Sequence, residues 1–162
     1  MSAAPRLSLS VQYADKPPDV PARALIRKWV RAALERDAEI AVRIVQEAEG
    51  RALNARYRGK DYATNVLSFG YDDDFSPPGT PLRGDLVLCA PVVGREAAQQ
   101  GKTVQAHYAH LVVHGMLHLQ GCDHESEAEA QGMEARESEI VMGLGYPDPY
   151  LGDGGRAVTP RP

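Results

Sequence analysis

Three histidines, His114, His118 and His124, stand at a spacing that suits the binding of one metal ion. Two histidines four residues apart on a helix project from one face, roughly 6 Å apart along the axis, so both imidazoles can reach one ion. His124 would lie about 9 Å further along a straight helix, whereas a zinc–nitrogen bond is only about 2.0–2.1 Å long. The helix must therefore end first. Gly121 stands where it can end, because glycine adopts the left-handed conformation that terminates helices.

All five histidines fall between residues 107 and 124, a clustering that random placement would rarely produce. His110, four residues before His114, is an alternative partner for it. However, His110 cannot join His118 on one ion, because eight helical residues span about 12 Å. The expected reversal of the chain favours His114 and His118 as ligands. His110 is then expected either to support a ligand from behind or to face the substrate. Asp123 could orient a ligand imidazole through a hydrogen bond, or it could form the turn.

Three neutral nitrogen ligands leave a fourth position open for water or substrate, which is the pattern of catalytic zinc. Three imidazoles also accept nickel, copper or iron. A bound metal of this kind lowers the pKa of water to about 7 and so supplies hydroxide at neutral pH. The spacing matches the zinc-protease pattern H-E-x-x-H-x-x-G-x-x-H, except that Gly115 replaces the glutamate that acts as general base. The sequence therefore indicates hydrolytic chemistry and disfavours a peptidase.

A basic segment, Arg56, Arg58 and Lys60, is a second candidate for function. Alone, such a cluster is typical of a solvated surface. Beside a metal site it becomes a candidate phosphate clamp, because an arginine fork binds phosphate oxygens bidentately and stabilises charge that develops on them. We interpret Arg56 and Lys60 as RNA-binding residues on this ground.

Length and composition limit the protein to a few classes. A chain of 162 residues suits one domain, and a formal net charge of −4 argues against a generally basic nucleic-acid coat, though not against a local basic patch. No apolar run approaches the roughly 18 residues that span a bilayer, and residues 1–15 lack the apolar core of a signal peptide. We therefore expect a cytoplasmic protein without a membrane partner, in which Cys89 and Cys122 are free.

The apolar patterns predict the fold class. Alternation and helical spacing predict strands at residues 7–11, 40–44, 65–71 and 84–89, and helices at residues 21–36, 47–54, from 91 onward, 103–119 and 126–144. A basic loop is expected at residues 56–60. We predict one α+β domain over residues 1–151, a small mixed sheet of about four strands packed with helices, with a His-rich metal site at a helix end. Residues 152–162 are expected to form a disordered tail.

Several motifs together resemble a known family. They are YRGKD at residues 57–61, TNVLSF at 64–69, GD at 84–85, the histidine run at 114–124, and LGYPDPY at 144–150. Their order and spacing are similar, from roughly Leu7 to Leu151, to those of the YbeY family of bacterial ribosomal-RNA maturation endoribonucleases.

This resemblance implies a single-strand-specific, metal-dependent endoribonuclease that acts in small-subunit (16S) rRNA maturation and late ribosome quality control. It implies one zinc ion (Zn2+) at His114, His118 and His124, and a functional, catalytic arginine at Arg58. The partners it implies are single-stranded RNA, the small-subunit rRNA precursor and the small ribosomal subunit, with no DNA expected.

We therefore hypothesise that a zinc-activated water cleaves RNA phosphodiesters while Arg58 neutralises the scissile phosphate. His110 or Asp123 could relay a proton. Attack by the 2′-hydroxyl of the RNA itself is the alternative. Two rival functions are a ribosome-assembly RNA-binding module that zinc merely stabilises, without turnover, and a metalloprotease, which Gly115 disfavours.

Overall fold

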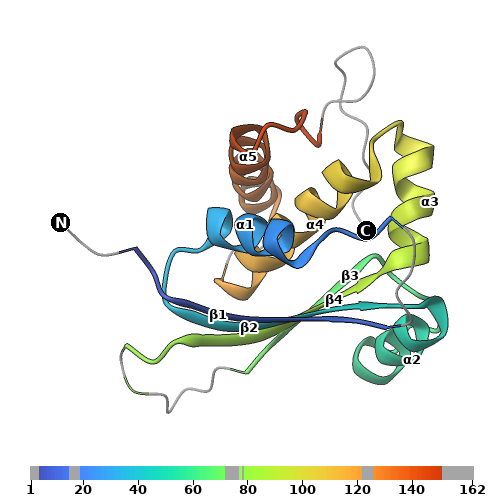
Figure 1. Ribbon diagram of the computed structural model, residues 1–162, viewed down its shortest axis with the longest axis horizontal. Coiled ribbons are helices and arrows are strands. Elements are labelled where there is room, and N and C mark those ends of the chain that lie inside the picture. The colour runs from blue at the N-terminus through green and yellow to red at the C-terminus, as the bar shows by residue number, and fades with distance from the viewer. Residues whose placement is uncertain (1–3, 15–18, 72–76, 78, 122–125, 151–162) are drawn as a thin grey trace.

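A four-stranded mixed sheet forms the centre of the fold in the computed structural model, which describes residues 4–14, 19–71, 77, 79–121 and 126–150 (Figure 1). The strands are β1 (Leu7–Tyr13), β2 (Ala38–Val45), β3 (Val66–Gly70) and β4 (Leu82–Cys89), in the order β1-β2-β4-β3. β1, β2 and β4 run parallel, whereas β3 pairs antiparallel with β4 and forms an edge of the sheet. The predicted α+β class and the mixed four-stranded sheet are thereby confirmed.

The helices cover both faces of this sheet. They are α1 (Arg23–Ala33), α2 (Glu47–Arg58), α3 (Ala90–Gln100), α4 (Val104–Leu119) and α5 (Glu127–Gly143). In Figure 1, α1 and α4 lie above the sheet, α5 stands behind them against α4, and α2 lies below. The helix α3 follows β4 directly and leads into α4. The central helix α4 is therefore enclosed by neighbours from several segments of the chain.

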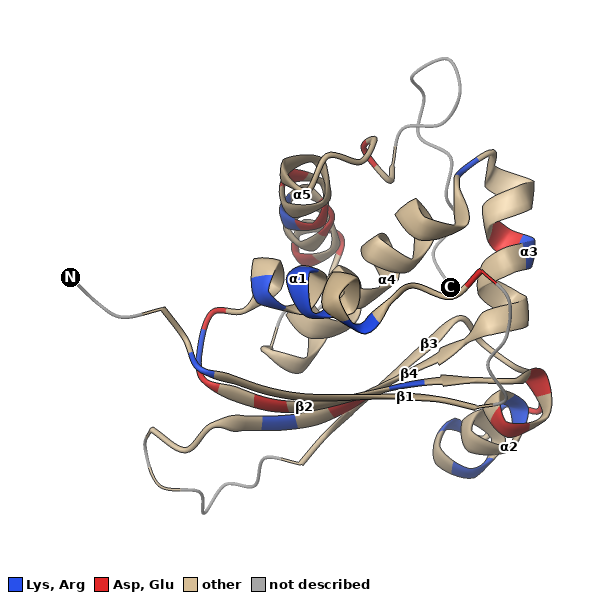
Figure 2. Cartoon of the chain, viewed as in Figure 1, with Lys and Arg blue, Asp and Glu red and all other residues tan. Residues whose placement is uncertain are grey.

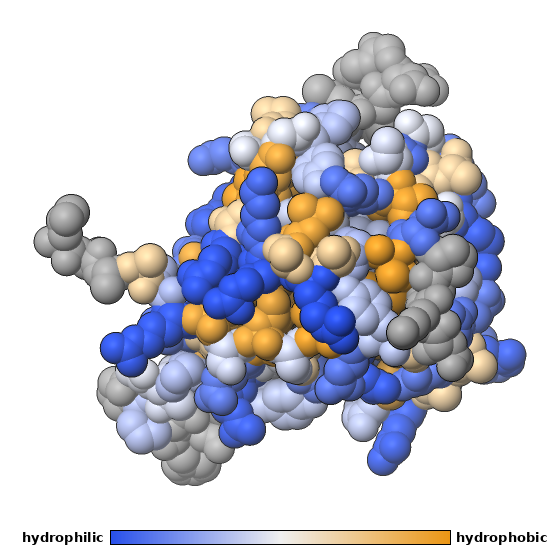
Figure 3. Space-filling model, viewed as in Figure 1, coloured by the Kyte–Doolittle hydropathy of each residue, from blue (hydrophilic) through white to orange (hydrophobic). Residues whose placement is uncertain are grey.

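The helix α1 is amphipathic, as its apolar spacing predicts. Its buried face carries Ile26, Trp29, Val30 and Ala33. Its exposed positions include arginine and lysine residues, where the cartoon is blue in Figure 2. In the space-filling view of the same side, hydrophilic groups lie among smaller hydrophobic patches (Figure 3). Burial of one apolar face is what fixes a helix of this kind on a sheet.

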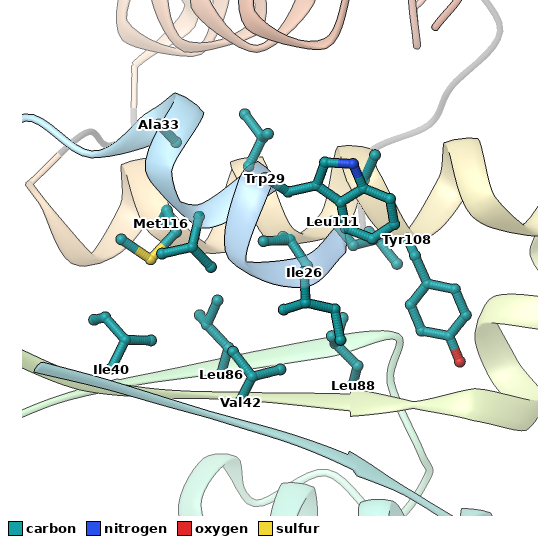
Figure 4. Packing of buried hydrophobic residues seen from close by; sticks show 14 of the residues in the cluster. Ile26, Trp29, Ala33, Ile40, Val42, Leu86, Leu88, Tyr108, Leu111 and Met116 are labelled. Atoms are coloured by element: carbon teal, nitrogen blue, oxygen red, sulfur yellow. The ribbon is translucent and has the colours of Figure 1, made fainter. Parts of the chain in front are cut away.

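The main core lies between the sheet and the pair α1 and α4. Side chains of β2 and β4 point up toward Ile26 and Trp29 of α1 and toward Met116 of α4 (Figure 4). Val42 and Leu86 are neighbours in register on adjacent strands, and both are fully buried. A smaller apolar cluster lies under α2 on the opposite face. Burial of this apolar surface is the dominant stabilising term for such a fold.

A close approach holds α4 against the sheet. A Cβ atom at Gly115 would lie 2.7 Å from Cδ2 of Leu86 and 3.3 Å from Oγ of Ser68. Glycine at this position therefore lets the helix approach β3 and β4 more closely than any other residue would. This contact determines how close the histidines of α4 lie to the sheet.

The end of α2 differs most from the prediction. α2 continues to Arg58, so Arg56 and Arg58 occupy its last turn and do not lie in a loop. The surface of this helix is largely polar, and its apolar spacing stops before the helix does. The spacing therefore cannot show where the helix ends. Gly59, with a φ of 69°, provides the left-handed end.

Two further predictions concern the cysteines and the membrane. Cys89 is free and buried, as predicted. Cys122 and the predicted tail at residues 152–162 lie outside the described residues. Among the helices that the structure describes, none is long and apolar enough to cross a bilayer.

Candidate functional site

The helix α4 carries a row of histidines along its length. His114 and His118 lie one turn apart, with ring centroids 6.5 Å apart and ring planes only 6° from parallel. The helix ends at Leu119, and Gly121 follows with a φ of +100°. The left-handed glycine that the sequence predicted is therefore present. His124 and Asp123 lie outside the described residues, so the third proposed ligand and its neighbour stay predictions.

A buried carboxylate from α5 lies behind this row. Glu137 is fully buried, and its Oε1 lies 2.7 Å from Nε2 of His110. Its other oxygen, Oε2, lies 2.8 Å from Nδ1 of His114. The hydroxyl of Tyr150 donates a further hydrogen bond to Oε1. A buried charge is costly unless it is fully hydrogen-bonded, and Glu137 meets that condition with three partners.

The charge on Glu137 determines where the imidazole protons lie. Burial raises the pKa of the Glu137 carboxyl, but the hydrogen bonds from His110 and His114 outweigh it and bring the pKa to about 2. An ionised carboxylate only accepts hydrogen bonds, so Nε2 of His110 and Nδ1 of His114 must both donate. Burial also lowers the pKa of His110, which keeps this imidazole neutral near pH 7.

This arrangement fits a metal centre. With its hydrogen on Nδ1, His114 carries its lone pair on Nε2, through which a neutral imidazole binds metal. A carboxylate that accepts from the second ring nitrogen is the usual companion of a metal-bound histidine. Within the residues that the structure describes, no three His, Cys, Asp or Glu side chains form a complete metal-binding group. His114 and His118 are therefore two of the three predicted metal ligands.

A cleft of about 630 Å³ opens over the histidines. Its walls come from α2, β3, α3, α4 and α5, and Arg58, Lys60, His110, His114 and His118 all line it. The structure thus brings together five of the residues selected from the sequence. Arg56 is not among the lining residues, and its guanidinium lies 5.4 Å from the ring centre of Tyr57.

A second polar cluster lies in the same cleft, beyond His110. Nδ2 of Asn65 donates to Oε1 of Glu96 at 2.9 Å, and Nε2 of His107 lies 2.9 Å from the same oxygen. Asn65 and His107 are buried, whereas the Glu96 side chain is 28% exposed. The three residues come from the start of β3, from α3 and from α4.

Sequence reasoning missed Glu137 and Glu96. A signal for Glu137 exists, because Met133, Glu137 and Val141 stand four residues apart and all are buried. A carboxylate within an apolar helical stripe indicates a buried charge with a partner. Glu96 gives a weaker signal, because it stands on α3 next to the buried Ala97 but its own side chain is partly exposed.

The position of Gly115 also bears on peptidase chemistry. The zinc-protease pattern requires a glutamate here, with its carboxylate in the active site. In this fold, position 115 faces Leu86 and Ser68 of the sheet. A longer side chain would collide with the core before it reached the cleft, so the geometry joins the sequence in disfavouring a peptidase.

Comparisons with known proteins agree on one family. The family model described as endoribonuclease YbeY matches residues 11–145. A protein named endoribonuclease YbeY from Azoarcus sp. (strain BH72) is 60% identical over 152 residues, which cover 90% of this chain and 60% of that protein's length. Its namesake from Aromatoleum aromaticum is 58% identical over 152 residues, covering 92% of this chain and 96% of that protein.

One solved structure has a similar fold. The solution structure of TM1509 from Thermotoga maritima superimposes with a TM-score of 0.53 and 24% sequence identity, over 84% of this chain and 90% of that one. At this identity the likeness concerns the fold alone.

Proposed function

The chain belongs to the YbeY endoribonuclease family, and from that premise we propose that it is a single-strand-specific, zinc-dependent endoribonuclease. Its substrate is the precursor of small-subunit rRNA, on or near the small ribosomal subunit, in the cytoplasm. Its role is the maturation of that RNA and the quality control of ribosomes.

The observation that carries this proposal is the meeting of two kinds of group in one cleft. Paired imidazoles, one of them backed by a carboxylate, line it together with the guanidinium of Arg58. Imidazoles suit a metal, and a guanidinium suits a phosphate. RNA, the substrate that the family's name gives, would present a phosphodiester to both.

His114, His118 and His124 would hold the zinc ion. When bound, zinc supplies a Lewis acid and a water of low pKa at neutral pH. Glu137 fixes the tautomer of His114 through its hydrogen bond to Nδ1, and His110 is held by the same carboxylate. Because His110 is buried against Glu137, we propose that it positions this carboxylate and does not relay a proton.

Arg58 and Lys60 would bind the RNA backbone from the opposite wall. Both cations lie at the end of α2, and both line the cleft. Arg58 would neutralise the scissile phosphate as negative charge builds on its oxygens, because a guanidinium can donate two parallel hydrogen bonds to them. The helices α2 and α5 flank the cleft, and a recessed site of this kind admits a single strand more readily than a rigid duplex.

A test is cleavage of an end-labelled single-stranded RNA by the wild-type protein, Arg58→Ala and His114→Ala. We expect both variants to lose cleavage. Arg58→Ala should keep the wild-type melting curve, whereas His114→Ala should still melt cooperatively, at the lower temperature of the metal-free protein. A 3′-hydroxyl product would indicate attack by water, and a cyclic 2′,3′-phosphate attack by the 2′-hydroxyl. Unchanged cleavage by both variants would contradict the proposal, and RNA binding without any turnover would favour the RNA-binding module.

A further inference from the structure

The cluster of Asn65, Glu96 and His107 has no part in the proposed metal chemistry. His107 stands seven residues before His114 on α4, which places it about 10 Å away along the axis. Burial of Asn65 and His107 is costly unless hydrogen bonds compensate, and both side chains bond to Glu96.

One oxygen of Glu96 is open to the cleft. Oε1 accepts from both Asn65 and His107. Among the described residues, none donates a hydrogen bond to Oε2. Since Glu96 lines the cleft and its side chain is 28% exposed, Oε2 is the atom that can accept from a ligand.

Part of the wall beside this carboxylate is apolar. Val92 stands one turn before Glu96 on α3, and Leu111 stands one turn after His107 on α4; both line the cleft. A nucleobase matches this setting, because it combines flat, weakly polar faces with a polar edge. A phosphate does not match it, because a carboxylate repels an anion.

We propose that Glu96 is a specificity-determining residue that accepts a hydrogen bond from the exocyclic amino group of a nucleobase, cytosine or adenine, next to the cleavage site. The inference rests on the proposed function for its substrate class. Burial raises the pKa of the Glu96 carboxyl, but its hydrogen bonds with His107 and Asn65 outweigh this and hold the pKa below its ordinary value. The carboxylate is therefore an acceptor at neutral pH.

The anchoring of Oε1 makes the Glu96→Gln variant informative. Two donors face that oxygen, so a glutamine would direct its carbonyl toward them and present its amide NH2 to the cleft. The open atom would change from an acceptor to a donor. Cytosine has an amino donor at position 4, where uracil has a carbonyl acceptor, so the preference between these two bases should invert.

The experiment measures equilibrium binding of oligouridine strands that carry one cytidine at successive positions. The protein carries Arg58→Ala, which slows turnover and affects both bases alike. The ratio of the dissociation constants of the cytidine and uridine strands therefore reports base recognition alone. With Glu96 present, we expect one position where cytidine binds about tenfold more tightly than uridine. Glu96→Gln should favour uridine there, and Glu96→Ala should favour neither base.

Two controls separate base recognition from a general effect of charge on RNA affinity. Glu47→Gln removes the same charge outside the cleft, where Glu47 pairs with Arg95, and should leave the cytidine preference intact. Independently of any variant at position 96, N4,N4-dimethylcytidine lacks both donor hydrogens and should bind no better than uridine. Its failure to lower affinity would overturn the inference.

Two further outcomes would also overturn it. One is a preference for cytidine that stays unchanged in Glu96→Gln. The other is a preference that changes with a 2′-deoxy substitution of the sugar and not with the base. Failure of the proposed function would show separately, as binding of single-stranded RNA by the wild-type protein without any cleavage. Because binding does not depend on turnover, the base preference can be decided in either case.

Discussion

Oε2 of Glu137 lies 2.8 Å from Nδ1 of His114, although the two residues are 23 positions apart and belong to different helices. The contact ties α5 to α4 at the point where the proposed metal ligands stand. It also determines which nitrogen of His114 is available to a metal. The carboxylate therefore belongs to the site as much as the imidazoles do.

Glu137→Gln should weaken zinc binding by about 10- to 100-fold, because an amide cannot accept hydrogen bonds through both of its atoms and no longer fixes the imidazole of His114. Competition with a chromogenic chelator measures the affinity. Glu139→Gln is the matched control, since Glu139 is exposed on the same helix, and it should bind zinc like the wild type. Equal affinities in all three proteins would show that Glu137 does not support the site.

Arg58 and Arg56 stand two residues apart on α2, but only Arg58 lines the cleft. Arg58→Ala should lower kcat/KM for single-stranded RNA by about 10²–10³, the usual cost of removing a group that stabilises transition-state charge. Arg56→Ala should change it by less than about threefold, as expected for an exposed cation. Steady-state kinetics on one oligonucleotide compares them, and similar losses for both variants would contradict the placement of Arg58.

Gly121→Ala should destabilise the protein by about 1 kcal/mol, because a φ of +100° is strained for any residue with a Cβ. A Cβ there would meet no atom of the described residues within 4 Å, so the prediction rests on backbone strain alone. Gly132→Ala on α5 is the control and should stabilise by up to about 1 kcal/mol, since alanine is the better helix former. Urea unfolding measures both changes, and a stabilised Gly121→Ala would show that the turn does not need glycine.

Removal of the metal should lower the melting temperature without unfolding the protein. The main core lies between the sheet, α1 and α4 and does not depend on the cleft, so the apo form should still melt cooperatively. With zinc at 100 times its Kd, the stabilisation is about 2.7 kcal/mol, or roughly 5–10 °C for a chain of this size. Calorimetry with and without chelator measures the shift. Collapse of the fold on chelation would favour a zinc-braced binding module instead.

The sequence predicts the positions of the site's histidines and glycine better than it predicts which residues they contact. The spacing of His114 and His118 and the glycine at 121 follow from helix geometry alone, and the structure has them as expected. The partner of His114 does not follow from it, because a stripe on α5 marks Glu137 as inward-facing without showing which element it meets. Contacts between segments far apart in the chain depend on how α4 and α5 pack.

The apolar spacing of the sequence also does not predict where α2 ends. Its apolar spacing ends early, although the helix itself continues to Arg58 and is ended by Gly59. The difference bears on the role proposed for Arg58, since it places this residue in the last turn of a helix. Glu96 was missed for a related reason: its role depends on Asn65 and His107, which only the fold brings to it.

The proposed activity depends most directly on a single metal ion held by His114, His118 and His124. Elemental analysis of protein purified without a histidine tag tests this. We predict about one zinc per chain in the wild type and in His107→Ala, whose ring hydrogen-bonds Glu96 instead. Zinc should be close to absent in His114→Ala, His118→Ala and His124→Ala. A full zinc content in His124→Ala, or no bound metal in the wild type, would contradict the account.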